Sequence, residues 1–203
     1  VDYDDTLRHR LDVAALADLT TLERYNLVDD AWAATISGRL AASELLVMLE
    51  AFANERDHAV WQAIVIALRG LNRLLDDGAA HDAFQQRVRA LAGPALTDLG
   101  EPHVGESDLT GKLRGLLTGA LGVLGGDVGV QARCRELFDA ASADPTSVDP
   151  ELTAAATSVV ARVAVASEHR APTRHTGQHA DGAGDRRRDR GDQDVAVLDM
   201  SQF

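Results

Sequence analysis

The sequence predicts an all-α protein, built as an irregular solenoid of antiparallel helix pairs with a polar C-terminal tail. Three observations support this fold class. Aromatic residues make up only 4% of the 203 residues while alanine and leucine are abundant, a composition that favours helix over strand. Apolar residues recur at spacings of three and four along most of the chain. Capping residues, glycines and prolines divide that pattern into short segments.

A capping box opens the first well-marked helix. Thr20 is followed by Glu23, the spacing at which each side chain bonds the other residue's backbone N–H. The helix then carries one apolar stripe, made of Tyr25, Val28 and Trp32. The Ser-Gly dipeptide at residues 37–38 ends it, because glycine takes the left-handed cap conformation at little cost.

Three more helices follow by the same criteria. The second contains Leu45, Leu49 and Phe52. The third begins near Asp57, a good N-cap, and runs to about Leu75 with a stripe of Trp61, Ile64, Val65 and Leu68. The fourth contains Phe84, Val88 and Leu91. We expect Gly93 and Pro94 to close the fourth helix, because proline removes a hydrogen bond from a helix interior.

The fifth helix carries leucines on one face and glycines on the other. Residues 100–107 form a loop, and Asp108 is the expected N-cap. The leucines are Leu109, Leu113, Leu116, Leu117 and Leu121; the glycines are Gly111, Gly115, Gly119 and Gly122. Each glycine costs a helix up to about 1 kcal/mol relative to alanine. Close helix packing or sequence drift is the favoured explanation of these glycines, and a bound ligand is the alternative.

Two helices and a tail complete the chain. The sixth helix contains Val130, Cys134, Leu137, Phe138 and Ala141. Asp149 as N-cap and Pro150 in the first turn start the seventh, which contains Leu152, Val159, Val160 and Val163. Short loops between helices are typical of stacked pairs such as HEAT and armadillo repeats, although no strict sequence repeat is visible. Residues 167–203 are so polar that we expect them to be disordered.

Composition excludes several classes of function. A formal net charge of −12 argues against a general nucleic-acid binder and against docking on anionic membranes. No apolar run is long enough to span a bilayer, and no signal peptide opens the chain. Cys134 is the only cysteine, which fits a reducing compartment and leads us to expect a cytoplasmic protein.

The residues that suggest catalysis are better explained by structure. Asp29 and Asp30 are adjacent on a helix and therefore point about 100° apart, so they do not converge on one substrate atom. We expect one of them to pair with Arg24 or Arg39 and the other to face water. Cys134 lies on an apolar stripe without a nearby histidine. Two tryptophans, Trp32 and Trp61, are expected in the core.

The polar tail and four arginines raise weaker possibilities. His169, His175 and His179 lack a carboxylate or thiolate at fixed geometry, so a metal site there is not expected. In "RRRDR" at 186–190, interleaved aspartates cancel much of the positive charge that nucleic-acid binding needs. If the chain encloses a peptide, one arginine of the helical region is a candidate to bind the terminal carboxylate of that peptide, and the sequence does not choose among Arg39, Arg69, Arg73 and Arg114.

The first helices resemble the C-terminal helical (ERAP1-like) domain of M1-family zinc aminopeptidases, of the actinobacterial aminopeptidase N type. The matching features are "LVDDAW" at 27–32, "GRL" at 38–40, a Glu-rich helix ending near Glu55 and a helix with Val60 and Trp61. "VDYD" at the start resembles the end of the β-sandwich that precedes this domain. The resemblance implies three parts: the end of that sandwich with a linker (1–18), a helical substrate-enclosing domain (19–166) and the tail (167–203).

The resemblance also implies that the chemistry lies elsewhere. In the family, His-Glu-x-x-His with a later Glu binds zinc and Gly-x-Met-Glu-Asn binds the substrate amine; both precede this domain, and neither motif occurs here. We therefore expect no catalytic, cofactor-binding or metal-ligating residue in this chain and no activity from it alone. The expected partners are an upstream catalytic domain of the same polypeptide, which would carry the zinc, and a peptide substrate.

Two alternatives stay open. The start at Val1 without methionine suggests a fragment, whereas a stand-alone helical scaffold that binds a protein or peptide would have its own start codon. A third, weaker possibility is a regulatory helical module that uses its tail as a disordered contact segment.

Overall fold

In the computed structural model, residues 16–76 and 78–170 are described, with side chains described as far as residue 166. Every regular element in those ranges is helical, which confirms the all-α prediction. The elements are α3 (Thr21–Ile36), α4 (Ala42–Glu50), η1 (Ala51–Asn54), α5 (His58–Asn72), α6 (Ala79–Leu99), α7 (Asp108–Val123), α8 (Val128–Ala143) and α9 (Pro150–Arg170). The expectations for residues 1–15 and 171–203 lie outside the described residues.

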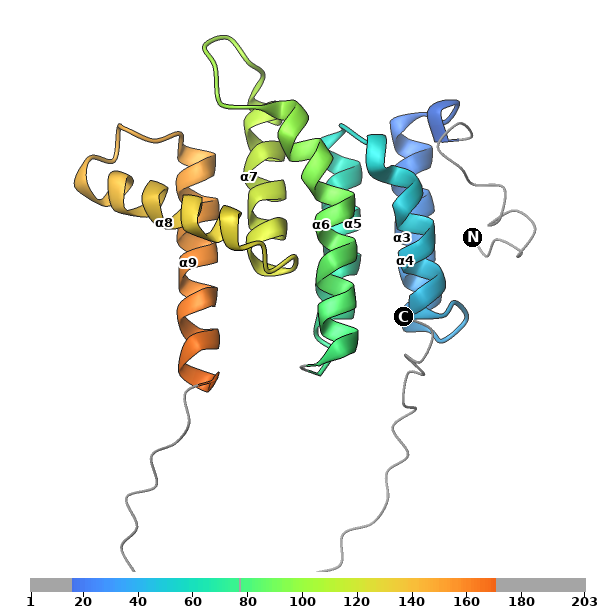
Figure 1. The fold of residues 1–203 in the computed structure, drawn as a ribbon. Helices are drawn as coiled ribbons and strands as arrows, with labels where there is room; N and C mark the ends of the chain where they lie inside the picture. The colour runs from blue at the N-terminus through green and yellow to red at the C-terminus, as the bar shows by residue number, and fades with distance from the viewer. Residues whose placement is uncertain (1–15, 77, 171–203) are drawn as a thin grey trace, which may run out of the picture.

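The helices form two layers (Figure 1). One layer consists of α3, α5, α7 and α9, which run in the same direction, and each of these helices packs against the next. In the other layer α4 and α6 run in the opposite direction, and α8 crosses over α7 and α9. This arrangement is compatible with an irregular solenoid of helix pairs.

Side-chain caps start the helices where the sequence predicts. The Thr20–Glu23 capping box forms, with the Thr20 N–H donating to Glu23 Oε2 at 2.8 Å. Asp57 accepts the Ala59 N–H at 2.8 Å, and Asp149 accepts the Glu151 N–H at 2.9 Å. At the other end of α3, Gly38 takes a positive φ of 73° directly after the Ser37 cap, as expected for a left-handed terminator.

Besides the end of α5, which lies at Asn72 and not near Leu75, two predicted boundaries are wrong. The helix α6 does not close at Gly93 and Pro94 but runs through them to Leu99, and Figure 1 shows its last turns leaning away from its first. A proline inside a helix costs about 3 kcal/mol or more, but Leu91, Ala92 and Ala95 are buried on both sides of this one, so tertiary packing maintains the helix.

The second wrong boundary is at the start of α7. Ser107, and not Asp108, is the N-cap, because its hydroxyl accepts the Thr110 N–H at 3.2 Å. Asp108 instead occupies the first turn, where a carboxylate interacts favourably with the helix dipole. The prediction located the polar start of the helix correctly and missed its cap by one residue.

The main core lies between the two layers and is centred on Trp61. This side chain is fully buried, and its indole N–H donates to the Glu55 carbonyl at 2.9 Å, so burial leaves no polar atom unsatisfied. Trp32 is only half-buried and lies against Gly70, where an added Cβ would come within 2.2 Å of the indole ring. The expectation of core tryptophans therefore holds fully for Trp61 and in part for Trp32.

Two of the α7 glycines let α9 approach closely. A Cβ added at Gly115 would lie 3.0 Å from the Glu151 carbonyl oxygen, and one at Gly122 would lie 2.7 Å from a Val159 methyl group. Gly119 has nothing within 4 Å of such a Cβ. The close-packing interpretation is thus confirmed at Gly115 and Gly122, whereas Gly119 faces open space.

Candidate functional site

The Asp29–Asp30 pair does not form a site around one atom. Asp29 is exposed and Asp30 is half-buried on the next position of α3. Arg24, which was considered as a partner for this pair, bonds Glu55 through Nε at 2.6 Å and donates to the Leu19 carbonyl at 2.6 Å. Arg24 therefore ties α3 to the segment that follows η1.

The Arg114 side chain bonds both ends of the loop at residues 100–107. Its side chain is 3% exposed, and its terminal nitrogens both donate to the Glu106 carboxylate at 2.7 Å. Its Nε donates to the Gly100 carbonyl at 2.7 Å. The hydrogen bonds with Arg114 lower the pKa of Glu106 and raise the pKa of Arg114 itself. Arg114 therefore clamps the two ends of loop 100–107 together and is not free to bind a peptide carboxylate.

The Arg114–Glu106 clamp predicts a pH dependence of stability. Because folding lowers the pKa of Glu106 below its usual 4.5, its contribution is present above that pH and is lost as the pH falls through the folded-state value. We expect Glu106→Gln to be less stable than wild type at pH 7, and the difference to shrink as the pH falls below 4.5. Urea unfolding from pH 7 to pH 3 measures it. Glu101→Gln, at a 78% exposed carboxylate, is the control, with a small difference at every pH.

Two of the four candidate arginines have side chains without a hydrogen-bond or ionic partner among the described residues. Arg39 donates to the Ser37 hydroxyl at 3.0 Å and makes further interactions. Arg69 and Arg73 are exposed at the C-terminal end of α5, and the side chain of neither makes a hydrogen bond or an ion pair with any residue that the structure describes. They are one helical turn apart, so their side chains leave α5 on the same face.

Helix α5 contains no acidic residue, whereas α7 begins at Asp108, and Asp76 follows Arg73 by three residues. Residues 58–75 and 109–126 include neither Asp nor Glu. The α7 segment adds Lys112, which is also exposed and unpaired within the described part of the chain.

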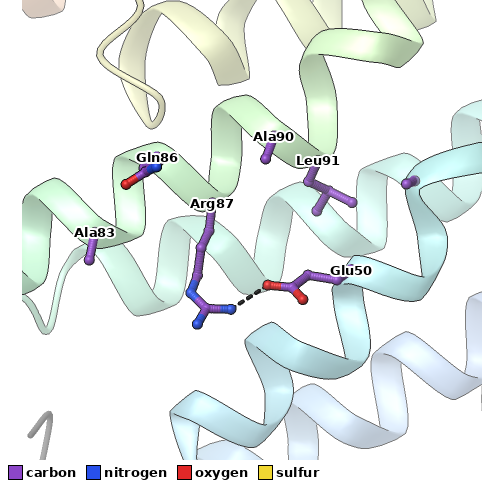
Figure 2. Close-up of a pocket in the computed structure, with 7 residues that line it drawn as sticks. Glu50, Ala83, Gln86, Arg87, Ala90 and Leu91 are labelled. Carbon is purple, nitrogen blue, oxygen red and sulfur yellow. Dashed lines mark hydrogen bonds and ion pairs between the residues drawn. The ribbon is translucent and has the colours of Figure 1, made fainter. Parts of the chain in front are cut away.

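A second feature is a groove between the two helices α4 and α6. It has a volume of about 640 Å³ and is lined by Glu50, Ala53, Ala83, Gln86, Arg87, Ala90 and Leu91. Figure 2 shows Arg87 reaching from α6 to the Glu50 carboxylate on α4, and this ion pair spans the groove. Three of the seven lining residues are alanine, and the two charged groups neutralise one another.

The remaining candidates offer no chemistry in the part of the chain that is described. Cys134 is fully buried beside Ala156 and Val159, and burial raises its thiol pKa, which disfavours the thiolate. No group of three or more His, Cys, Asp or Glu side chains in the described ranges could hold a metal ion. The side chains of His169, His175, His179 and residues 186–190 lie outside these ranges. Within the same limits, no helix is long and apolar enough to cross a membrane.

Comparison with known proteins assigns the fold to a family. Residues 1–171 match the model of the ERAP1-like C-terminal domain. The chain belongs to this family. Similar proteins include Aminopeptidase M1-B of Oryza sativa subsp. japonica, which is 30% identical over 131 residues. Aminopeptidase M1 of Arabidopsis thaliana is 32% identical over 152 residues, and Tricorn protease-interacting factor F2 of Thermoplasma acidophilum is 29% identical over 100 residues.

The chain corresponds to only a small part of the length of each relative. The aligned regions cover 63%, 71% and 49% of the chain for the rice, Arabidopsis and Thermoplasma proteins, but only 15%, 17% and 12% of those proteins. The resemblance to the C-terminal domain of M1 aminopeptidases is thereby confirmed. Sequence reasoning did not show that Arg69 and Arg73 are the candidate arginines whose side chains lack a partner among the described residues.

Proposed function

We propose that the chain is the substrate-enclosing C-terminal domain of a zinc aminopeptidase and has no catalytic activity of its own. The match of residues 1–171 to the ERAP1-like C-terminal domain carries this proposal. The complete enzyme would remove N-terminal residues from peptides, and an upstream domain of the same polypeptide would hold the zinc. We further propose a cytoplasmic location, since the single cysteine fits a reducing compartment.

The proposed role of this chain is to form one wall of the cavity that encloses the peptide substrate. A catalytic zinc needs three protein ligands and an open position, and the described residues offer no such set. Their contribution would be to bind and orient the distal part of the peptide and to limit its exposure to water. The layer of α3, α5, α7 and α9 is suited to this, because its parallel helices form one continuous surface.

We also propose a division of the chain into three parts. Residues 1–18 would link to a preceding β-sandwich, residues 19–166 would form the enclosing domain and residues 167–203 would be a polar tail. In the structure α9 extends to Arg170, four residues beyond the proposed end of the enclosing domain.

An activity assay tests the proposal. The purified chain with added zinc should show no turnover of leucine 4-nitroanilide, whereas the polypeptide extended upstream to include the His-Glu-x-x-His segment should turn it over. Deleting residues 19–166 from the extended enzyme should lower kcat/KM for a ten-residue peptide more than for leucine 4-nitroanilide, which is too short to reach the wall. Zinc-dependent turnover by the chain alone would refute the non-catalytic assignment.

A further inference from the structure

We propose that residues 195–203 of this chain dock into a pocket between α6, α7, α8 and α9 of its own helical domain. These residues lie outside the described part of the chain. The lining of the pocket, the sequence of the segment and the length of chain between the two support this contact. It goes beyond the proposed function, which assigns no role to the tail.

Four large apolar side chains line the pocket, which has a volume of about 330 Å³. Leu96, Val130 and Leu137 are half-buried, and Leu152 of α9 is buried. The polar part of the lining is already satisfied, because no buried side-chain nitrogen or oxygen among the described residues lacks a hydrogen-bond partner. The pocket therefore favours apolar groups, and its volume lies at the lower end of the usual range for ligand sites, about 300–1,000 Å³.

The end of the chain has the composition that such a pocket requires. Residues 171–194 contain no Val, Leu, Ile, Met, Phe, Tyr or Trp. Residues 195–203, "VAVLDMSQF", contain five of these large apolar residues: Val195, Val197, Leu198, Met200 and Phe203. Burial of one such side chain favours the bound state by about tenfold or more. The segment therefore gains from leaving water, whereas the stretch before it does not.

The intervening chain is long enough to bring the segment to the pocket. Leu152 lies near the start of α9, and α9 ends at Arg170, so about 27 Å of helix separate them at a rise of about 1.5 Å per residue. A random coil of 24 residues, the length of 171–194, has a root-mean-square end-to-end distance of about 27 Å. A tethered segment reaches its highest effective concentration, on the order of millimolar, when these two lengths match.

Arg133 offers a partner to the carboxylate of Asp199, which lies between Leu198 and Met200 in the segment. The Arg133 side chain lines the pocket and is 54% exposed. Its ion pairs with Glu101 at 3.8 Å and Glu136 at 3.3 Å are on the surface, where such pairs contribute little to stability. Asp199 can therefore compete with these two carboxylates for Arg133 while its apolar neighbours enter the pocket.

Two other pockets suit the segment less well. The groove between α4 and α6 is spanned by the ion pair of Arg87 and Glu50. The pocket beside Leu16 has a volume of about 190 Å³ and includes the ion pair of Arg24 and Glu55. Neither of them is lined by α9, the helix from which the tail departs.

A spin label on the complete chain tests the contact. Ser201→Cys introduces the attachment point, and Cys134 does not compete for the label because it is fully buried. In an amide NMR spectrum the label should broaden the signals of Val130, Leu137 and Leu152. The signals of α3 and α4, at the other end of the domain (Figure 1), should keep the intensity that they have with the chemically reduced label.

Matched variants separate docking from random approach of the tail. Leu198→Ser with Met200→Ser keeps the label, the chain length and the charge. The docking equilibrium should fall by about tenfold or more, and the broadening with it, because two apolar side chains no longer leave water. Arg133→Gln should reduce the broadening, whereas Arg135→Gln, which removes the same charge from an exposed position on α8, should not.

Three results would contradict the proposed contact. Unchanged broadening in the double serine variant would overturn docking through the apolar side chains, and broadening centred on the groove between α4 and α6 would overturn the choice of pocket. Equal effects of Arg133→Gln and Arg135→Gln would overturn the pairing of Asp199 with Arg133.

A mixed sample distinguishes docking within one chain from docking between two copies. Isotope-labelled chain without a spin label is combined with spin-labelled chain that carries no isotope. Docking within one chain predicts no broadening at Val130, Leu137 or Leu152 in this sample. Broadening as strong as that within one chain would show that the segment comes from a second copy, and would overturn the intramolecular contact.

Discussion

Replacing Trp61 by alanine should lower the free energy of unfolding by about 3 to 5 kcal/mol, the usual cost of removing a large aromatic side chain from a core. The indole is fully buried between the layers, and its N–H bonds the Glu55 carbonyl, so the substitution leaves both a cavity and an unpaired acceptor. Urea denaturation followed by circular dichroism measures the loss as a shift of the midpoint at constant m value.

Trp61→Phe separates the two contributions. It keeps most of the ring and removes only the hydrogen bond, and its expected cost is about 1 to 2 kcal/mol. If Trp61→Ala changed stability by less than that, Trp61 would not be the centre of the core.

Gly122→Leu should destabilise the protein by about 2 to 3 kcal/mol, because overfilling a packed contact forces backbone and side chains apart. The first atom of the new side chain would already lie 2.7 Å from a methyl group of Val159 on α9. Gly119→Leu, on the same helix, is the matched control: nothing lies within 4 Å of its added Cβ. The control should be neutral or more stable by up to about 1 kcal/mol, since it removes a helical glycine.

A double variant checks the mechanism of the Gly122 effect. Val159→Ala costs stability alone but should offset part of the Gly122→Leu loss, because it removes the methyl groups that the leucine meets. Strictly additive effects, or equal effects of Gly119→Leu and Gly122→Leu, would mean that α9 does not pack on α7 as described.

The sequence predicted helix starts better than helix ends. The caps at Thr20, Asp57 and Asp149 were predictable because a side chain bonds a backbone group within three residues, a contact that local sequence encodes. Pro94 misled the prediction for the opposite reason. Its local preference to end a helix is overridden by the burial of Leu91, Ala92 and Ala95, which depends on distant parts of the chain.

The same distinction applies to the candidate site. The spacing of Arg69 and Arg73 along one helix predicts that they share a face. It does not predict that Arg114 bonds Glu106 and two backbone carbonyls. Sequence alone therefore left four arginines equivalent. Separating them required the side-chain contacts of the folded chain, which bind Arg114 and leave Arg69 and Arg73 unpaired among the described residues.

The Arg114 clamp gives loop 100–107 an anchored base and an unattached tip. One guanidinium holds Gly100 and Glu106 at either end of the loop, while Val104 between them is fully exposed. We therefore expect substitutions at Val104 to leave the packing of α6 and α7 unchanged. A fluorophore or spin label placed at residue 104 would report on whatever approaches this edge of the domain, without disturbing the packing beneath it.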